Sequence, residues 1–265
     1  MIDPKVFAEL QSRGIITMVG MKPTDFKSIN ELMELGVATT PDSDEVYETI
    51  VQKFFNADEI REKFLADVAN GGNVTLVADV ELNDYIEIRN DVTIDLNGYN
   101  IIHPMSSPSK YPDVFEVMTG GRLTINGSGK VVAENGYAVY AAGDAVVEIN
   151  GGEFISPVSA VDARKNASVT INDGTFMVDG SNNADGDFGQ KFTLNLRDKK
   201  GNYASELSEI VVKGGKFYKY NPAASESEPE ITNFVAAGYE SVEDGDWFIV
   251  RKSEISEIVV DEGNE

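Results

Sequence analysis

The chain has one histidine and no cysteine, and its most suggestive candidates for chemistry are three aspartates near an arginine. Asp91, Asp95 and Asp113, together with Arg89 or Arg122, are the residue types of a calcium site beside a base that abstracts a proton. Asp91 and Asp95 fit a turn and the outward face of a strand equally well. The sequence therefore favours a structural role for them, and we expect no catalytic residue.

Other candidate sites are also open to a structural interpretation. The single histidine, His103, precedes a proline, and the absence of cysteine excludes thiolate metal sites. Residues 183–187 resemble a calcium loop, but its glycine and distal glutamate are misplaced, so a polar turn is favoured. We expect neither a metal nor a cofactor. Four aromatic residues could form a sugar-stacking patch, or cover the end of the core: Tyr218, Tyr220, Tyr239 and Trp247.

The charge of the chain restricts its partners. Asp and Glu number 45 against 22 Lys and Arg, which gives a formal net charge of -23. Such a surface repels phosphate groups, so nucleic acid and anionic membranes are poor partners. No apolar run approaches the roughly 18 residues of a membrane helix. Met1–Lys5 lacks the features of a signal peptide, so we expect a protein made in the cytoplasm without membrane insertion.

The N-terminal region has the pattern of short amphipathic helices. Phe26, Ile29, Leu32 and Met33 lie at helical spacing and are candidates for docking on a partner. The same apolar residues could equally pack within the region or cap the rest of the protein. Both interpretations stay open.

The pattern of the chain divides it into three parts. Residues 1–56 are expected to form an anchoring or docking region that is mostly helical. Residues 57–251 begin with a helix that ends at Gly71 and Gly72, after which apolar and polar residues alternate as in strands. This part should close with a hairpin, and residues 252–265 form an acidic tail.

An internal repeat of 22 residues determines the predicted fold. Residues 138–154 (AVYAAGDAVVEINGGEF) align without a gap on residues 160–176 (AVDARKNASVTINDGTF), and nine of the 17 positions are identical. A unit of this length without a helical pattern suits one coil of a β-solenoid, whose coils gain stability by stacking on similar neighbours. The expected fold is therefore mainly β: a right-handed parallel β-helix of about 22-residue coils, preceded by a small helical region.

The repeat also predicts which residues stack inside and which form the turns. A matched turn asparagine could hydrogen-bond the equivalent asparagine one coil away and accept a left-handed backbone. The predicted core ladder contains Val139, Val147, Ile149, Phe154, Val161, Val169, Ile171 and Phe176. The predicted asparagine ladder contains Asn97, Asn126, Asn150 and Asn172.

Two segments resemble known β-helix proteins. Residues 71–76 followed by 92–98 look like the opening coil of pectate-lyase-like β-helix proteins, which are frequent among bacterial surface proteins and bacteriophage virion proteins. Residues 214–239 are similar to a C-terminal coil in β-helix proteins of gut Bacteroides and their phages. The resemblance covers roughly residues 58–251. Hydrolases of this family carry paired aspartates and a Gly-His-Gly, and this chain has neither.

The resemblance implies a non-catalytic virion protein as the leading hypothesis. The β-helix would project from a bacteriophage capsid as a head fibre or decoration, anchored to capsid or other virion proteins through the N-terminal region. Such projections are usually homotrimers, and they can bind a glycan of the host surface. The alternatives are a bacterial surface adhesin and a polysaccharide lyase or hydrolase of the same fold.

Overall fold

The computed structural model describes residues 57–105, 113–178, 192–197, 207–228 and 230–254. The candidate docking residues Phe26, Ile29, Leu32 and Met33 lie outside these ranges, as do the predicted loop at residues 183–187 and the acidic tail from residue 255 onward. The described chain is mainly β-structure with one helix, and most of its strands pair in parallel.

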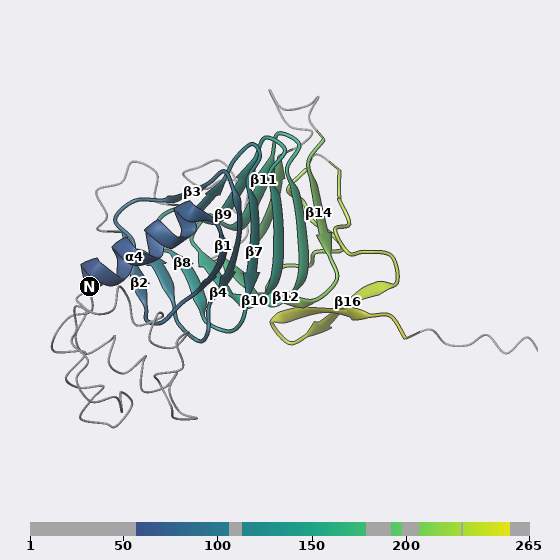
Figure 1. Cartoon of the computed structure of the whole chain (residues 1–265). Coiled ribbons are helices and arrows are strands. Elements are labelled where there is room, and N and C mark those ends of the chain that lie inside the picture. The colour runs from purple at the N-terminus through teal and green to yellow at the C-terminus, as the bar shows by residue number, and fades with distance from the viewer. Residues whose placement is uncertain (1–56, 106–112, 179–191, 198–206, 229, 255–265) are drawn as a thin grey trace, which may run out of the picture.

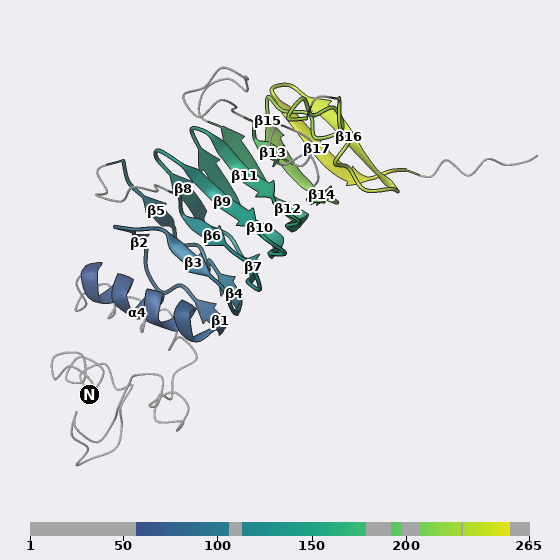
Figure 2. The same cartoon turned by 90° about the horizontal axis from the view of Figure 1, so that it is seen from above.

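Helix α4 (Ala57–Asn70) covers one end of the stacked strands (Figures 1 and 2). Its Phe64 and Val68 are buried against the core because they lie on one face of the helix, while Asp58 and Glu59 occupy the first turn, where negative charge stabilises a helix. Gly71 ends it with a φ of 79° and an N–H that binds the carbonyl oxygen of Val68 at 3.1 Å.

The strands form two sheets, and each repeat of the chain adds strands to both (Figure 2). The larger sheet has 12 strands and the smaller has five, in the order β13-β11-β9-β6-β3. The larger sheet contains β1 (Gly72–Thr75), β2 (Val80–Glu81), β4 (Asp91–Asp95), β5 (Ile101–His103), β7 (Arg122–Asn126), β8 (Lys130–Ala133), β10 (Val146–Ser156), β12 (Ser168–Val178), β14 (Glu209–Val212), β15 (Gly215–Tyr218), β16 (Tyr239–Asp244) and β17 (Trp247–Lys252). The smaller sheet contains β3 (Ile86–Ile88), β6 (Phe115–Val117), β9 (Tyr137–Ala142), β11 (Ser159–Arg164) and β13 (Leu194–Arg197).

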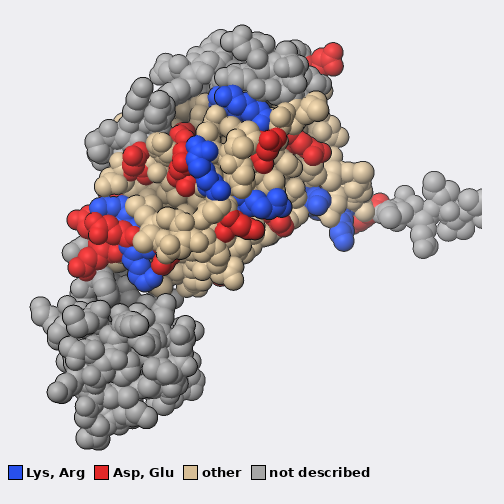
Figure 3. Space-filling model, turned by 45° about the horizontal axis from the view of Figure 1, so that its top comes forward, with Lys and Arg blue, Asp and Glu red and all other residues tan. Residues whose placement is uncertain are grey.

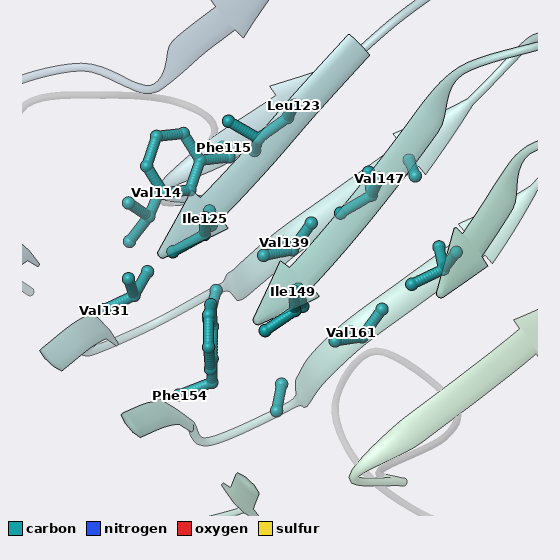
Figure 4. Packing of buried hydrophobic residues seen from close by; sticks show 14 of the residues in the cluster. Val114, Phe115, Leu123, Ile125, Val131, Val139, Val147, Ile149, Phe154 and Val161 are labelled. Carbon is teal, nitrogen blue, oxygen red and sulfur yellow. The ribbon is translucent and has the colours of Figure 1, made fainter. Parts of the chain in front are cut away.

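The pairs aligned by the 22-residue offset are neighbours across the sheets. Val147 pairs with Val169, Ile149 with Ile171 and Phe154 with Phe176 on β10 and β12, and Val139 pairs with Val161 on β9 and β11. All eight side chains are buried in one continuous hydrophobic core, part of which is seen in Figure 4. Like side chains therefore lie on like side chains, which repeats the same packing from strand to strand.

Three phenylalanines stack on one another in the second half of the core. The rings of Phe154 and Phe176 stack with centroids 5.1 Å apart, and those of Phe176 and Phe217 with centroids 5.0 Å apart. All three side chains are fully buried. The sequence spacing is 22 residues for the first pair and 41 for the second, so the extra residues between Phe176 and Phe217 leave the stacking unchanged.

The asparagine ladder forms at three of its four predicted positions. Asn172 donates from Nδ2 to Oδ1 of Asn150 at 2.7 Å, and Asn150 donates in the same way to Asn126 at 2.9 Å. The prediction was wrong for Asn97, whose Nδ2 binds the carbonyl oxygen of Leu76 instead. The strand register places Asp95, two residues earlier, beside Asn126.

The two roles predicted for the asparagines belong to different residues. Asn97 has a φ of 47° and takes the left-handed turn conformation, and its N–H binds Oδ1 of Asp95 at 3.0 Å. Asn126, Asn150 and Asn172 are absent from the described residues with positive φ and form the amide ladder. Matching each asparagine to a following glycine therefore aligned a turn residue with the ends of strands.

Replacing Asn150 by alanine should remove two amide hydrogen bonds at once, because Asn150 is the middle member of the ladder. We expect the free energy of unfolding to fall by about 1–2 kcal/mol, measured by urea denaturation. Asn73→Ala is the control, since Asn73 is an exposed asparagine on β1 outside the ladder, and its replacement should cost less than about 0.5 kcal/mol. Equal losses in the two variants would contradict this assignment.

A hairpin closes the other end of the stack (Figures 1 and 2). β16 and β17 pair antiparallel, and β17 pairs antiparallel with β15, the last strand of the stacked repeats on that face. Its Val250 is buried against the core. The hairpin therefore covers the backbone edge of β15.

Candidate functional site

The three aspartates considered as a calcium site are not gathered in the structure. Asp91 and Asp95 lie on β4 of the larger sheet, where Asp91 is the register partner of Arg122 and Asp95 accepts a turn hydrogen bond. Asp113 lies just before β6 of the smaller sheet. Within the ranges that the structure describes, no group of three His, Asp or Glu side chains is placed to hold a metal ion.

His103 has a structural position. Its side chain is fully buried, and Nδ1 lies at hydrogen-bond distance from the carbonyl oxygen of Asp113. A carbonyl oxygen only accepts, so Nδ1 carries the proton and donates it. The imidazole therefore connects β5 with the start of β6, and its burial keeps it from contacting a substrate.

The four aromatic residues near the C-terminus do not form one exposed patch. Tyr220 is buried, and its hydroxyl group donates to the carbonyl oxygen of Leu194 at 2.9 Å and lies 2.8 Å from Oγ of Ser225. Burial raises the pKa of its phenol. Tyr218 and Trp247 contact each other with ring centroids 5.1 Å apart, across the β15–β17 pair. Tyr218 and Trp247 therefore hold β17 of the closing hairpin against β15.

The outer face of the smaller sheet carries a group of interacting polar side chains. Glu87, Glu116, Tyr140, Asp162 and Asn195 are successive register partners on β3, β6, β9, β11 and β13. We call these five residues the polar row. Their strand neighbours on both sides point into the core, so the alternation of the strands places this row outward.

Asp162 and Asn195 are fully buried although they belong to this outward row. Asp162 accepts a hydrogen bond from Nε of Arg164 at 2.7 Å and another from Nδ2 of Asn195 at 2.8 Å. The guanidinium of Arg164 also lies over the ring of Tyr140, 4.6 Å from its centroid. Burial alone would lower the pKa of Arg164, but the neighbouring carboxylate of Asp162 raises it, so Arg164 keeps its positive charge although it is largely buried.

Asp113 and Glu116 form a second carboxyl pair next to this one. Burial raises the pKa of Asp113 to about 6, even though Oδ1 accepts the N–H of Tyr137 at 2.7 Å. Burial, and then the negative charge of Asp113, raise the pKa of Glu116 to about 7. Protonated Glu116 donates a hydrogen bond to Asp113, so the two carboxyl groups share a proton near neutral pH.

Neighbouring groups of the protein engage these acidic side chains. Asp113 and Asp162 are buried and bound to backbone or arginine groups. These contacts connect neighbouring strands of the smaller sheet.

The shared proton predicts a dependence of stability on pH. Because the folded state holds protons on Asp113 and Glu116 that the unfolded chain releases at lower pH, stability should fall as pH rises from about 4 to about 7. Glu116→Gln cannot ionise, so its melting temperature at pH 8 should exceed that of the wild type by a few degrees. The gain is about 1 kcal/mol, because the half-exposed side chain is partly screened by water.

Thermal denaturation between pH 4.5 and 8 measures this effect. Glu81→Gln, at an exposed position on β2, removes the same formal charge and should leave the slope of melting temperature against pH close to the wild-type slope. A slope equally reduced in both variants would attribute the dependence to net charge rather than to the Asp113–Glu116 pair.

Sequence reasoning missed the polar row, although a signal for it was present. In the 22-residue alignment, Tyr140 is matched by Asp162 and Ala142 by Arg164. Identical positions in the alignment mark the core, because the core repeats from one strand to the next. Positions that differ mark the outer face, where each repeat can carry its own side chain. The mismatches were therefore the places to search for a site.

Comparison with protein-family models, with curated proteins and with solved structures found no match. The one helix in the described part of the chain is too short and too polar to cross a membrane. Acidic and basic side chains are interspersed over the surface seen in Figure 3.

Proposed function

We propose that the parallel sheets are the faces of a right-handed β-helix, and that this β-helix is a non-catalytic structural and attachment module. The observation that carries the proposal is the continuous buried core, in which strands of neighbouring repeats pair in parallel in both sheets, at an offset of 22 residues between β10 and β12 and between β9 and β11. Such a core yields a stiff module, since each repeat is held by its neighbours. The helix at one end and the hairpin at the other protect its edges.

Such a module is best suited to a bacteriophage virion. The chain would form a head fibre or capsid decoration, as a homotrimer anchored to the capsid through residues 1–56, with a host glycan as a possible ligand of the projecting part. The resemblance of residues 71–76, 92–98 and 214–239 to β-helix proteins of bacteria and their phages supports this assignment.

Co-expression with the capsid protein encoded nearest to this gene tests the virion assignment. The full chain should sediment with assembled capsids, and replacing Phe26, Ile29, Leu32 and Met33 together by serine should release it. Free chain in the supernatant of the wild type would contradict the proposal. Sedimentation with whole bacterial cells and not with capsids would instead support the surface adhesin.

A polysaccharide-cleaving enzyme is the second candidate, because Glu116 on the outer face and the neighbouring Asp113 are carboxyl groups with raised pKa values. Incubation with pectins and capsular glycans between pH 4.5 and 8 tests it. The proposal predicts neither new reducing ends nor unsaturated products. Product formation that is lost in Glu116→Gln and kept in Glu81→Gln would overturn the non-catalytic assignment.

A further inference from the structure

A groove of about 440 Å³ lies beside β14, at the end of the stack where the regular repeats stop. One wall is Ser208–Val211 and the other is the segment of residues 232–237. On its far side β14 pairs in parallel with β12 along all four of its residues. The groove therefore occupies the position that the next strand of the sheet would fill.

The edge of β14 that faces this groove is only partly paired. Val212 binds the carbonyl oxygen of Phe234 at 2.8 Å through its N–H and accepts the N–H of Ala236 at 2.9 Å. In a parallel pair, alternate residues direct both backbone groups to the same side, so Ile210 directs its N–H and C=O into the groove as Val212 does. Within the described ranges neither group of Ile210 has a partner.

The chain contains a second copy of the β14 sequence. Residues 256–260 (SEIVV) repeat Ser208–Val212 (SEIVV) without a change, and an aliphatic residue precedes each copy. The second copy lies beyond the described residues. Neighbouring strands on this face align aliphatic with aliphatic residues, as Val169 with Ile210 and Ile171 with Val212. A further strand with the sequence of β14 therefore fits the vacant edge.

We propose that residues 256–259 of a second copy of this chain add to the free edge of β14 as a parallel strand in register. Ile258 then lies beside Ile210. The N–H of Ile210 donates to the carbonyl oxygen of Glu257, and the N–H of Val259 donates to the carbonyl oxygen of Ile210, as in other strand additions. Val235 already occupies the place beside Val212, so the added strand ends there.

The position of Ser253 disfavours pairing of this edge with the tail of the same chain. The N–H of Ser253 binds the carbonyl oxygen of Gly238 at 2.9 Å, two residues after Ala236, which is held at the Val212 end of β14. A parallel strand has to begin at the Ser208 end of β14. Four residue steps of strand separate that end from Val212, a distance of about 13 Å. The three residue steps from Ser253 to Ser256 reach only about 10 Å. A second copy has no such restriction.

Analytical ultracentrifugation of the full chain over a range of concentrations tests the proposal. The wild type should associate as its concentration rises. Val259→Pro removes the N–H that Ile210 accepts and should weaken association at least tenfold. Glu262→Pro introduces the same residue outside the paired stretch and should behave as the wild type. Glu257 faces Glu209 in this register, so Glu257→Lys should tighten association severalfold.

Hydrogen exchange at Ile210 identifies the strand that occupies the groove. Its amide should become protected as the wild type associates, and remain exchangeable in Val259→Pro. A fluorescent peptide of residues 253–262 should bind the Val259→Pro chain, and the same peptide with proline at position 259 should not. Association that persists in Val259→Pro, a wild type that stays monomeric, or protection that is independent of concentration would each overturn the proposal.

Discussion

Replacing Phe176 by alanine is expected to lower the free energy of unfolding by about 4 kcal/mol, among the largest losses that a single substitution can cause in this core. Phe176 is fully buried and stacks on Phe154 on one side and Phe217 on the other. Its removal leaves a cavity between two rings that the backbone register holds apart, because β12 stays paired with its neighbours. The cavity therefore cannot close without a further loss of free energy.

Urea denaturation measures the loss as a shift of the midpoint at constant slope. Thr175→Ala is the matched control, since Thr175 precedes Phe176 on β12 and faces outward. It should change the free energy of unfolding by less than about 0.5 kcal/mol. A loss below about 1 kcal/mol for Phe176→Ala would mean that the aromatic stack does not hold the repeats together.

Gly129→Ala is expected to destabilise the protein by about 4 kcal/mol. Gly129 has a φ of 132°, a backbone conformation that is strained for any residue with a side chain. A Cβ atom there would also overlap the carbonyl oxygen of Tyr99 on the neighbouring repeat. Its own carbonyl oxygen accepts the N–H of Glu153 at 2.8 Å, so the turn is fixed from the other neighbour as well. Backbone on both sides prevents the turn from moving away.

Gly98→Ala separates the two causes of this loss. Gly98 also has a positive φ, 84°, but no atom lies within 4 Å of a Cβ built there. Only conformational strain applies, and we expect a loss of about 1 kcal/mol. Thermal and urea denaturation of both variants measure the difference. Equal losses would show that stacked turns are not in the close contact that the structure describes.

The sequence was sufficient to predict the core residues because the same core residues recur in the repeat. Val147, Ile149 and Phe154 recur 22 residues later as identical residues and pair with their copies in register. The repeat was a weaker guide where its length varies. Between Ile94 and Ile125 the offset is 31 residues, so aligning Asn97 by its following glycine placed it two residues out of register.

The site was less predictable than the core for a physical reason. Outward side chains are free to differ between repeats, so Glu116, Tyr140 and Asp162 do not stand out as a pattern. Their interaction depends on which strands become neighbours, since Asp162 and Asn195 are 33 residues apart in the sequence and hydrogen-bonded in the structure. Only the strand register brings them together.

A designed disulfide measures the central claim, that residues 22 apart lie side by side. Glu148 and Thr170 are register partners on β10 and β12, at the about 4.8 Å spacing of adjacent strands, which a disulfide can bridge. The chain has no cysteine of its own, so Glu148→Cys with Thr170→Cys gives one unambiguous pair. The control combines Glu148→Cys with Ser168→Cys, two residues out of register on the same face and about 8 Å away.

Mild oxidation followed by peptide mass mapping gives the answer. We predict an intramolecular disulfide between positions 148 and 170 in nearly all molecules, and almost none between positions 148 and 168. A chain that fails to link 148 with 170, or links the two pairs equally well, would contradict the in-register stack and the structural role that is built on it.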